Sequence, residues 1–137
     1  MTIDSAPFRL ISYHFTIASL PFNIPENPNL NISFDPKGEY NPSTGEFILF
    51  FEVKVVYEET EKEVIVVDCI ATFKFKDPIS VSDIPEFFYP NSLAILFPYV
   101  RAFVSTISLQ ANVPPIVLPT INLTGLTSVL KQNTISK

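Results

Sequence analysis

Two segments in the middle of the chain alternate between apolar and mixed positions with a period of two residues. Every odd position from Phe47 to Tyr57 is apolar, and the alternation resumes from Ile65 to Phe75 after the acidic stretch EETEKE. Two such segments joined by a short polar turn predict a long antiparallel β-hairpin. One face must meet a core. The other face is also half apolar, which is more than a solvent-facing side requires and indicates an additional partner.

Two further strands are expected before this hairpin. Residues 8–17 (FRLISYHFTI) have apolar side chains on both faces, and the proline-rich stretch 21–29 must be a loop or an extended crossover. A short strand then begins at Leu30. We expect the Asp-Pro dipeptide at 35–36 to end this strand and a turn to follow at the Lys-Gly pair 37–38.

Between Asn91 and Ala111 the apolar period becomes that of a helix. The apolar stripe is so broad that we expect two layers to cover this helix. Pro98 either begins the main helix in its first turn or kinks a longer one. The Pro-Pro pair at 114–115 ends the helix, and extended chain follows. A short second helix is expected from Asn122, whose side chain can cap it, and only the last few residues look frayed.

Composition favours association with other molecules. The 137 residues fit one domain, 1–137, and hydrophobic residues make up 47% of the chain against 17% charged residues. A folded monomer of this mass exposes on the order of 7,000 Å². The few charged side chains cannot cover that area well, so we expect apolar surface that is buried against other chains or reserved for a ligand.

Charge and cysteine content exclude several classes of protein. A net charge of −5 argues against nucleic-acid binding, which needs clustered Lys and Arg. The single cysteine, Cys69, excludes an internal disulfide and fits a reducing compartment. The N-terminal residues contain no apolar run of signal-peptide length, so we expect a cytoplasmic protein. The apolar segment 95–123 contains four prolines and is too interrupted to cross a membrane, so no membrane insertion is expected.

Residues with catalytic or metal-binding potential are isolated along the chain. His14 has no partner at a suitable spacing, and Cys69 alternates with apolar neighbours as a small core residue does. The acidic cluster at 58–63 spans a turn and is expected only to solvate it. No enzymatic machinery, metal site, cofactor site or ATP site is visible. Arg101 is the one charged residue on the apolar helix. Its side chain either reaches the surface or forms an ion pair that fixes a helix–helix contact.

The segment PNSLAILFPYVRAFVSTISLQANVPPIVLPTINLTGL (90–126) resembles the C-terminal half of the SecB protein-export chaperone family. That family's pattern is Pro-Asn, then Ile-Leu-Phe-Pro-Tyr-x-Arg opening the long helix, then a proline, Leu-x-Pro-x-Asn and a short apolar helix. The matching residues are Pro90, Asn91, Ile95, Leu96, Phe97, Pro98, Tyr99, Arg101, Pro115, Leu118, Pro119, Asn122 and Leu126. The resemblance covers roughly residues 8–130 and is closest over 90–126.

The resemblance implies an α+β fold: a four-stranded antiparallel sheet with one long and one short C-terminal helix, assembled as a dimer of dimers. It implies long helices sandwiched between dimers and sheets that face outward. Family members hold unfolded preproteins in apolar grooves and pass them to the SecA motor, and some relatives instead serve antitoxins. The chain departs from the family by an insertion at 92–94 and by the lack of a polar, acidic C-terminal tail.

Three sets of residues are candidates for contacts with partners. A client groove between the crossover and the second helix is expected to use Ile24, Leu30, Ile32, Phe34, Ile121, Leu123, Leu126 and Leu130, although each of these could be ordinary core. The long helix is expected to build the homotetramer through Tyr99, Val100, Phe103, Val104 and Ile107. The acids that could dock a motor are Glu52, Glu58 and Asp68.

Three hypotheses for the function remain open. The first is an ATP-independent holdase for exported or general unfolded clients, and the second is a dedicated chaperone of one partner such as an antitoxin. The third is a carrier of a small apolar ligand that uses the same cavity. A single strongly preferred client would indicate the second hypothesis, and a bound lipid the third.

Overall fold

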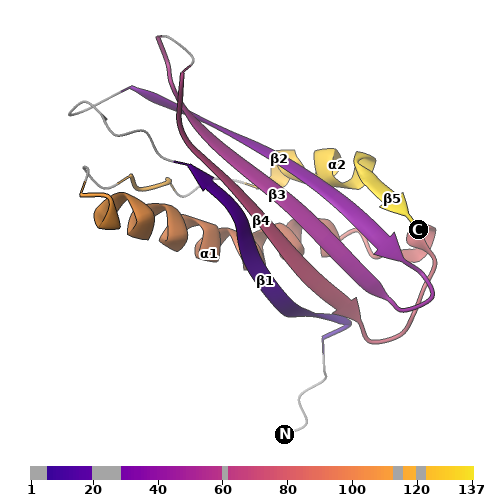
Figure 1. Ribbon diagram of the computed structural model, residues 1–137. Helices are drawn as coiled ribbons and strands as arrows, with labels where there is room; N and C mark the ends of the chain where they lie inside the picture. Colours follow the sequence, from indigo (N-terminus) through magenta and orange to yellow (C-terminus); the bar gives the residue numbers. More distant parts are fainter. Residues whose placement is uncertain (1–5, 20–28, 60–61, 113–115, 120–122) are drawn as a thin grey trace, which may run out of the picture.

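The computed structural model describes residues 6–19, 29–59, 62–112, 116–119 and 123–137. Within them, five strands form one sheet in the order β1-β4-β3-β2-β5 (Figure 1). The strands are β1 (Phe8–Ser19), β2 (Leu30–Asn41), β3 (Glu46–Tyr57), β4 (Glu63–Phe75) and β5 (Thr134–Ser136). The hairpin of β3 and β4 is confirmed, with Phe47 opposite Phe73 and Val55 opposite Ile65.

The fifth strand corrects two expectations, a four-stranded sheet and a frayed C-terminus. β5 runs parallel to the end of β2, where Gly38 lies opposite Thr134. The backbone N–H of Lys137 donates to the carbonyl of Tyr40 (2.8 Å), and the Lys137 ammonium lies 3.0 Å from the Glu39 carboxylate. Three residues are too few to show a period, so this strand has no signature in the sequence.

β2 continues straight through the dipeptide at 35–36, where the sequence predicted its end. Its register with β3 is unbroken from Leu30 to Asn41. The N–H of Gly38 points away from β3, to the carbonyl of Asn133 (3.1 Å). Residues two apart in a strand direct their N–H groups to the same side. The nitrogen of Pro36 therefore faces the outer edge, where a missing N–H breaks no ladder bond.

Gly38 serves packing and is not the turn that the sequence predicted. A Cβ built there would lie 2.3 Å from the ring of Phe47 and 2.8 Å from the hydroxyl of Thr134. The turn instead occupies residues 42–45, where Gly45 has a φ of 76° that suits glycine.

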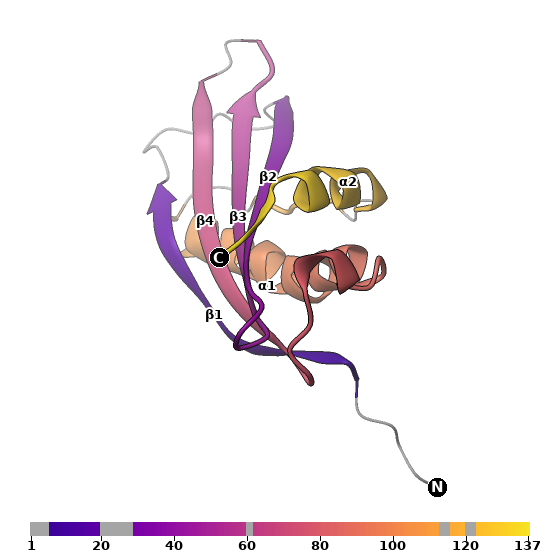
Figure 2. The same cartoon turned by 90° about the vertical axis from the view of Figure 1, so that its right-hand side faces the viewer.

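Both helices lie on one side of the sheet (Figure 2). A short 3₁₀ turn (η1, Val81–Asp83) leads to α1 (Phe88–Gln110), which contains Pro98 well inside it, so the longer-helix alternative is correct. α2 (Thr124–Gln132) begins without a side-chain cap. The predicted cap, Asn122, lies outside the described residues.

The core lies between α1 and the alternating apolar face of the sheet. The odd positions of β3 from Phe47 to Val55 are all buried, as are those of β4 from Ile65 to Phe75. At one end, the ring of Phe88 on α1 lies 4.7–4.9 Å from the rings of Phe8, Phe47 and Phe75. Aromatic packing of this kind anchors the start of the long helix on the sheet.

We expect Gly38→Ala to destabilise the protein by about 1–3 kcal/mol, because the Phe47 ring leaves no room for a methyl group. Gly125→Ala is the matched control. Its Cβ would meet nothing within 4 Å, and in helix α2 it should stabilise the fold by roughly 0.5–1 kcal/mol. Denaturant unfolding measures both, and equal free energies of unfolding for the two variants would contradict this account of Gly38.

Candidate client-binding and docking surfaces

A polar stripe of α1 holds the chain that follows it. The Nε–H of Arg101 donates to the carbonyl of Leu118 (2.7 Å), and the hydroxyl of Ser105 donates to the carbonyl of Ile116 (3.1 Å). The N–H of Ile116 donates to the hydroxyl oxygen of Ser108 (3.0 Å). Among the described residues Arg101 has no ion pair of the kind predicted as one alternative, and its half-buried side chain bonds to a backbone carbonyl instead. These bonds fix residues 116–118 alongside α1.

The predicted client residues that the structure describes lie on β2 and on α2, two elements that pack against each other. The half-buried members, which rest on the core and keep part of their surface open, are Leu30, Ile32, Phe34, Leu123 and Leu126. Phe34 packs its ring against those of Phe51 (5.8 Å) and Phe97 (5.9 Å). Leu130 is fully buried, so in this structure it is core. Ile24 and Ile121 lie outside the described residues.

The outer side of α1 differs from the predicted interface. Val100 and Val104 are fully buried under the sheet. Tyr99 stacks on Tyr13 of β1 (4.5 Å) and Phe103 on Phe15 (3.8 Å), so both are engaged within the chain, and Ile107 is half-buried. A helix that is apolar all round does not reveal from its sequence which stripe meets the core.

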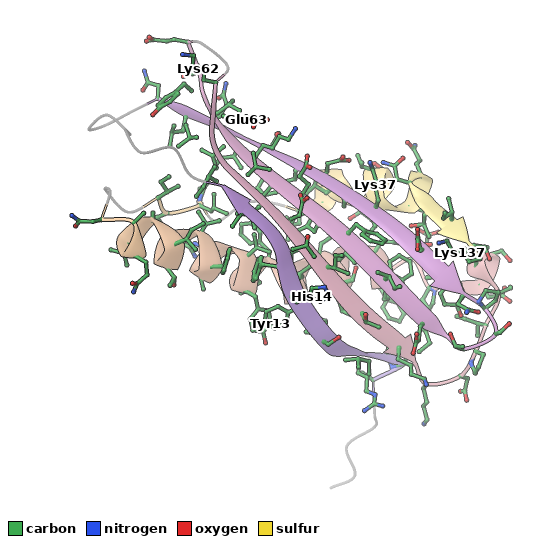
Figure 3. The ribbon with its side chains drawn as sticks, viewed as in Figure 1. Tyr13, His14, Lys37, Lys62, Glu63 and Lys137 are labelled. Atoms are coloured by element: carbon green, nitrogen blue, oxygen red, sulfur yellow. The ribbon has the colours of Figure 1, made fainter. Side chains whose placement is uncertain are left out.

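The exposed apolar side chains of this region form what we call the α1 stripe. Its members are Ile11, Tyr13, Ile95, Tyr99 and Leu109. Leu109 is the most exposed of the five, at 59%. Tyr13 lies on β1 next to His14, as Figure 3 shows. The stripe therefore combines the outer side of α1 with one edge of the sheet.

By length and apolar composition alone, α1 is sufficient to cross a membrane. The sequence prediction concerned the segment 95–123, which has different bounds, and this finding on residues 88–110 does not test it. In the structure, Leu93, Leu96 and Val100 are completely buried against the sheet. A helix that covers a core can have this same composition, so the composition alone does not distinguish a core helix from a membrane-spanning helix.

Three carboxylates form a row across the uncovered face of the sheet, and we call it the acidic row. Asp35 pairs in register with Glu52, and Glu52 with Asp68. The sequence analysis singled out Glu52 and Asp68 but not Asp35. Asp35 lies on β2 and comes next to Glu52 only through the pairing of β2 with β3. Glu58 lies beyond the end of β3 and does not join the row. The flanking lysines are close, with Lys37 3.6 Å from Asp35 and Lys54 3.5 Å from Glu52.

Burial raises the pKa of the Asp68 carboxyl, and the charge and hydrogen bonding of Glu52 raise it further. One Asp68 oxygen, Oδ1, is buried without a hydrogen-bond partner. The row borders a depression of about 320 Å³ that Phe50 and Ile70 also line. Such a surface offers negative charge beside apolar area, which suits a basic, partly apolar partner.

The isolated reactive residues lie in ordinary structural settings. Cys69 is buried, and desolvation raises the pKa of its thiol to about 11, so the reactive thiolate is suppressed. His14 is exposed on β1 opposite Ile70. In the described part of the chain, no group of three His, Cys, Asp or Glu side chains could hold a metal ion.

This architecture, a twisted sheet with one long and one short helix on a single face, defines an α+β fold of the SecB type. The chain matches the family model described as preprotein translocase subunit SecB over residues 3–133. It therefore belongs to the SecB family, as the segment 90–126 suggested.

Two individual proteins are similar to this chain. The uncharacterized protein MJ0357 of Methanocaldococcus jannaschii is 32% identical over 110 residues, which cover 78% of this chain and 71% of that protein. The Mycobacterium tuberculosis Rv1957 SecB-like chaperone, solved with a ChAD peptide from the Rv1956 HigA1 antitoxin, superposes with a TM-score of 0.67. The match covers 85% of this chain and 88% of that one at 13% identity, so it shows the shared fold.

We expect Asp68→Asn to stabilise the protein at pH 7. A folded-state pKa above the unfolded value means that ionised Asp68 opposes folding at neutral pH and that this penalty is lost as pH falls. The gain should be on the order of 0.5 kcal/mol at pH 7, since solvent screens the pair, and should vanish near pH 4. Thermal melts at both pH values test this, with Glu59→Gln in the turn after β3 as control. An equal gain at both pH values would refute the electrostatic explanation.

Proposed function

We propose that this chain is an ATP-independent molecular chaperone that holds unfolded polypeptides in the cytoplasm. The observation that carries the proposal is a set of half-buried apolar side chains on two elements that pack against each other: Leu30, Ile32 and Phe34 on β2, and Leu123 and Leu126 at the start of α2. Membership of the SecB family supports the same function. Apolar side chains that stay partly open on a rigid sheet are suited to reversible contact with other apolar groups.

Such a surface can bind clients without reading a particular sequence. Each Å² of apolar area removed from water contributes about 25 cal/mol, so a few client side chains suffice for micromolar affinity. The sheet beneath Ile32 and Phe34 is fully packed, and the surface therefore need not reorganise when a client binds. Release then depends on folding of the client or on an external motor.

Two classes of client are candidates for this chaperone. Exported preproteins come first, because the family model is that of a preprotein translocase subunit. A single antitoxin-like client is the second candidate, since the structurally similar Rv1957 chaperone was solved with an antitoxin peptide. If a motor such as SecA receives the client, we propose that the acidic row of Asp35, Glu52 and Asp68 is the docking surface, with Glu58 outside it.

We propose that the chain assembles as a homotetramer, a dimer of dimers, through the α1 stripe. Ile95, Tyr99 and Leu109 are exposed on one side of the helix, and Tyr13, which stacks on Tyr99, extends the same apolar area onto β1, the strand that also exposes Ile11. Burial of this area against a second copy would cover both sides of α1, which its composition favours.

The double variant Ile32→Ser/Leu126→Ser should weaken binding of a permanently unfolded protein by at least about tenfold, because two apolar contacts are lost. Ile48→Ser, equally half-buried but on the uncovered face of the sheet, is the matched control and should bind as the wild type does. Fluorescence titration with reduced, carboxymethylated α-lactalbumin measures the affinity. Loss of binding in the control alone would contradict the assigned surface, and a lipid extracted from the purified wild type would favour the carrier alternative.

Ile95→Lys/Leu109→Lys should convert the proposed tetramer to smaller species, because charges would replace two exposed apolar side chains of the α1 stripe. Size-exclusion chromatography with light scattering gives the mass directly. Ile135→Lys is the control, since Ile135 is also exposed but lies on β5. A monomeric wild type, or a tetramer that survives both lysines, would rule out this interface.

A further inference from the structure

Positive charge gathers where β1 begins and β4 ends, which are side by side in the sheet (Figure 1). Arg9 on β1 pairs in register with Lys74 on β4, and Lys76 follows directly after that strand. The N–H of Lys76 donates to the carbonyl of Pro7 (2.9 Å), which keeps the two chain segments together beyond the strand pair. The three cations line a depression of about 310 Å³, which we call the basic pocket. Its other lining residues are Ala6, Phe8 and Phe75.

The basic pocket opens on the sheet face that the helices leave uncovered. Phe73 and Phe75, the neighbours of Lys74, are buried with their rings against Phe88 of α1. Successive side chains of a strand alternate between faces, so Lys74 points to the other face, and its partner Arg9 does so too. The rings of Phe8 and Phe75 pack 5.9 Å apart within the core, so the base of the pocket is held in place.

The like charges of the pocket are not neutralised by neighbouring side chains. Like charges directly opposite each other in an antiparallel pair destabilise a sheet. Among the described residues, none of Arg9, Lys74 and Lys76 forms an ion pair. By contrast, Lys37 and Lys54 on the same face lie 3.6 Å and 3.5 Å from a carboxylate. The pocket therefore keeps its charge available to a ligand.

Acidic side chains are near the pocket but do not line it. Glu46 pairs in register with Lys74 from β3, and Asp77 follows Lys76 in the sequence. Neither is among the described residues that line the depression, and all the charged side chains that do line it are cations. Three of the nine Lys and Arg residues of a chain with net charge −5 thus meet at one site without counter-charge.

We propose that the basic pocket binds a compact, multiply charged anion of the phosphate class, carried by a small soluble molecule. The Arg9 guanidinium can donate two parallel hydrogen bonds to phosphate oxygens, and the two ammonium groups supply point charges beside it. The pocket volume is at the lower end for small-molecule sites, which suits a compact anion better than an extended acidic polypeptide. The pocket lies on the face opposite the proposed client residues, so this binding does not rest on the chaperone function.

Calorimetric titration of the full chain with inorganic pyrophosphate at constant ionic strength tests the site. Arg9→Gln/Lys74→Gln should weaken binding at least about tenfold, because two charged hydrogen-bond donors are lost. Lys37→Gln/Lys54→Gln is the matched control, since it removes the same charge from the same face, and it should bind as the wild type does. Equal losses in the two double variants would reduce the effect to net charge and overturn the site. Absence of binding to the wild type would also overturn it.

Backbone NMR of the wild type locates the anion without any substitution. Pyrophosphate should shift the amide signals of Arg9, Lys74 and Lys76 and leave those of Lys37 and Lys54 in place. It should also raise the melting temperature of the wild type, because a ligand of the folded state stabilises it. Shifts centred on Lys37 and Lys54 would refute the assigned pocket. Co-sedimentation with phosphatidic acid vesicles, without any shift by pyrophosphate, would overturn the soluble ligand in favour of a lipid headgroup.

Discussion

The packing of α1 along one face of the five-stranded sheet is the constraint on which the other features depend. Phe88 anchors the helix in a cluster of aromatic rings, and Leu96, Val100 and Val104 continue the contact along the strands. A helix can pack only one of its sides against a single sheet. Because α1 is apolar on more than that stripe, folding of a single chain leaves hydrophobic area in water.

The remaining surfaces have separate positions and different chemistry. The α1 stripe is apolar, the proposed client residues on β2 and α2 are half-buried apolar side chains, and the acidic row lies on the opposite face of the sheet. Arg101 and Ser105 hold the chain between the helices and so fix where that chain runs along α1. The proposed self-association, client binding and motor contact would therefore use different surfaces of the molecule.

The sequence predicted the elements whose apolar pattern repeats over many residues. It missed the features that depend on strand register or on only a few residues. The hairpin of β3 and β4 and the helix α1 repeat their patterns over ten residues or more, so both were found. β5 is too short to show a pattern, and β2 tolerates Pro36 because its nitrogen faces away from β3. Asp35 joins Glu52 through strand pairing, which no spacing along the chain reveals.

The central claim is that non-native polypeptide is held on the apolar side of β2, and photo-crosslinking locates that contact most directly. A benzoylphenylalanine in place of Phe34 would lie among the half-buried residues beside α2, whereas one in place of Phe50 would lie on the uncovered face beside the acidic row. On irradiation with reduced, carboxymethylated α-lactalbumin, the account predicts strong crosslinking from position 34 and little from position 50. Crosslinking from position 50 alone would contradict it.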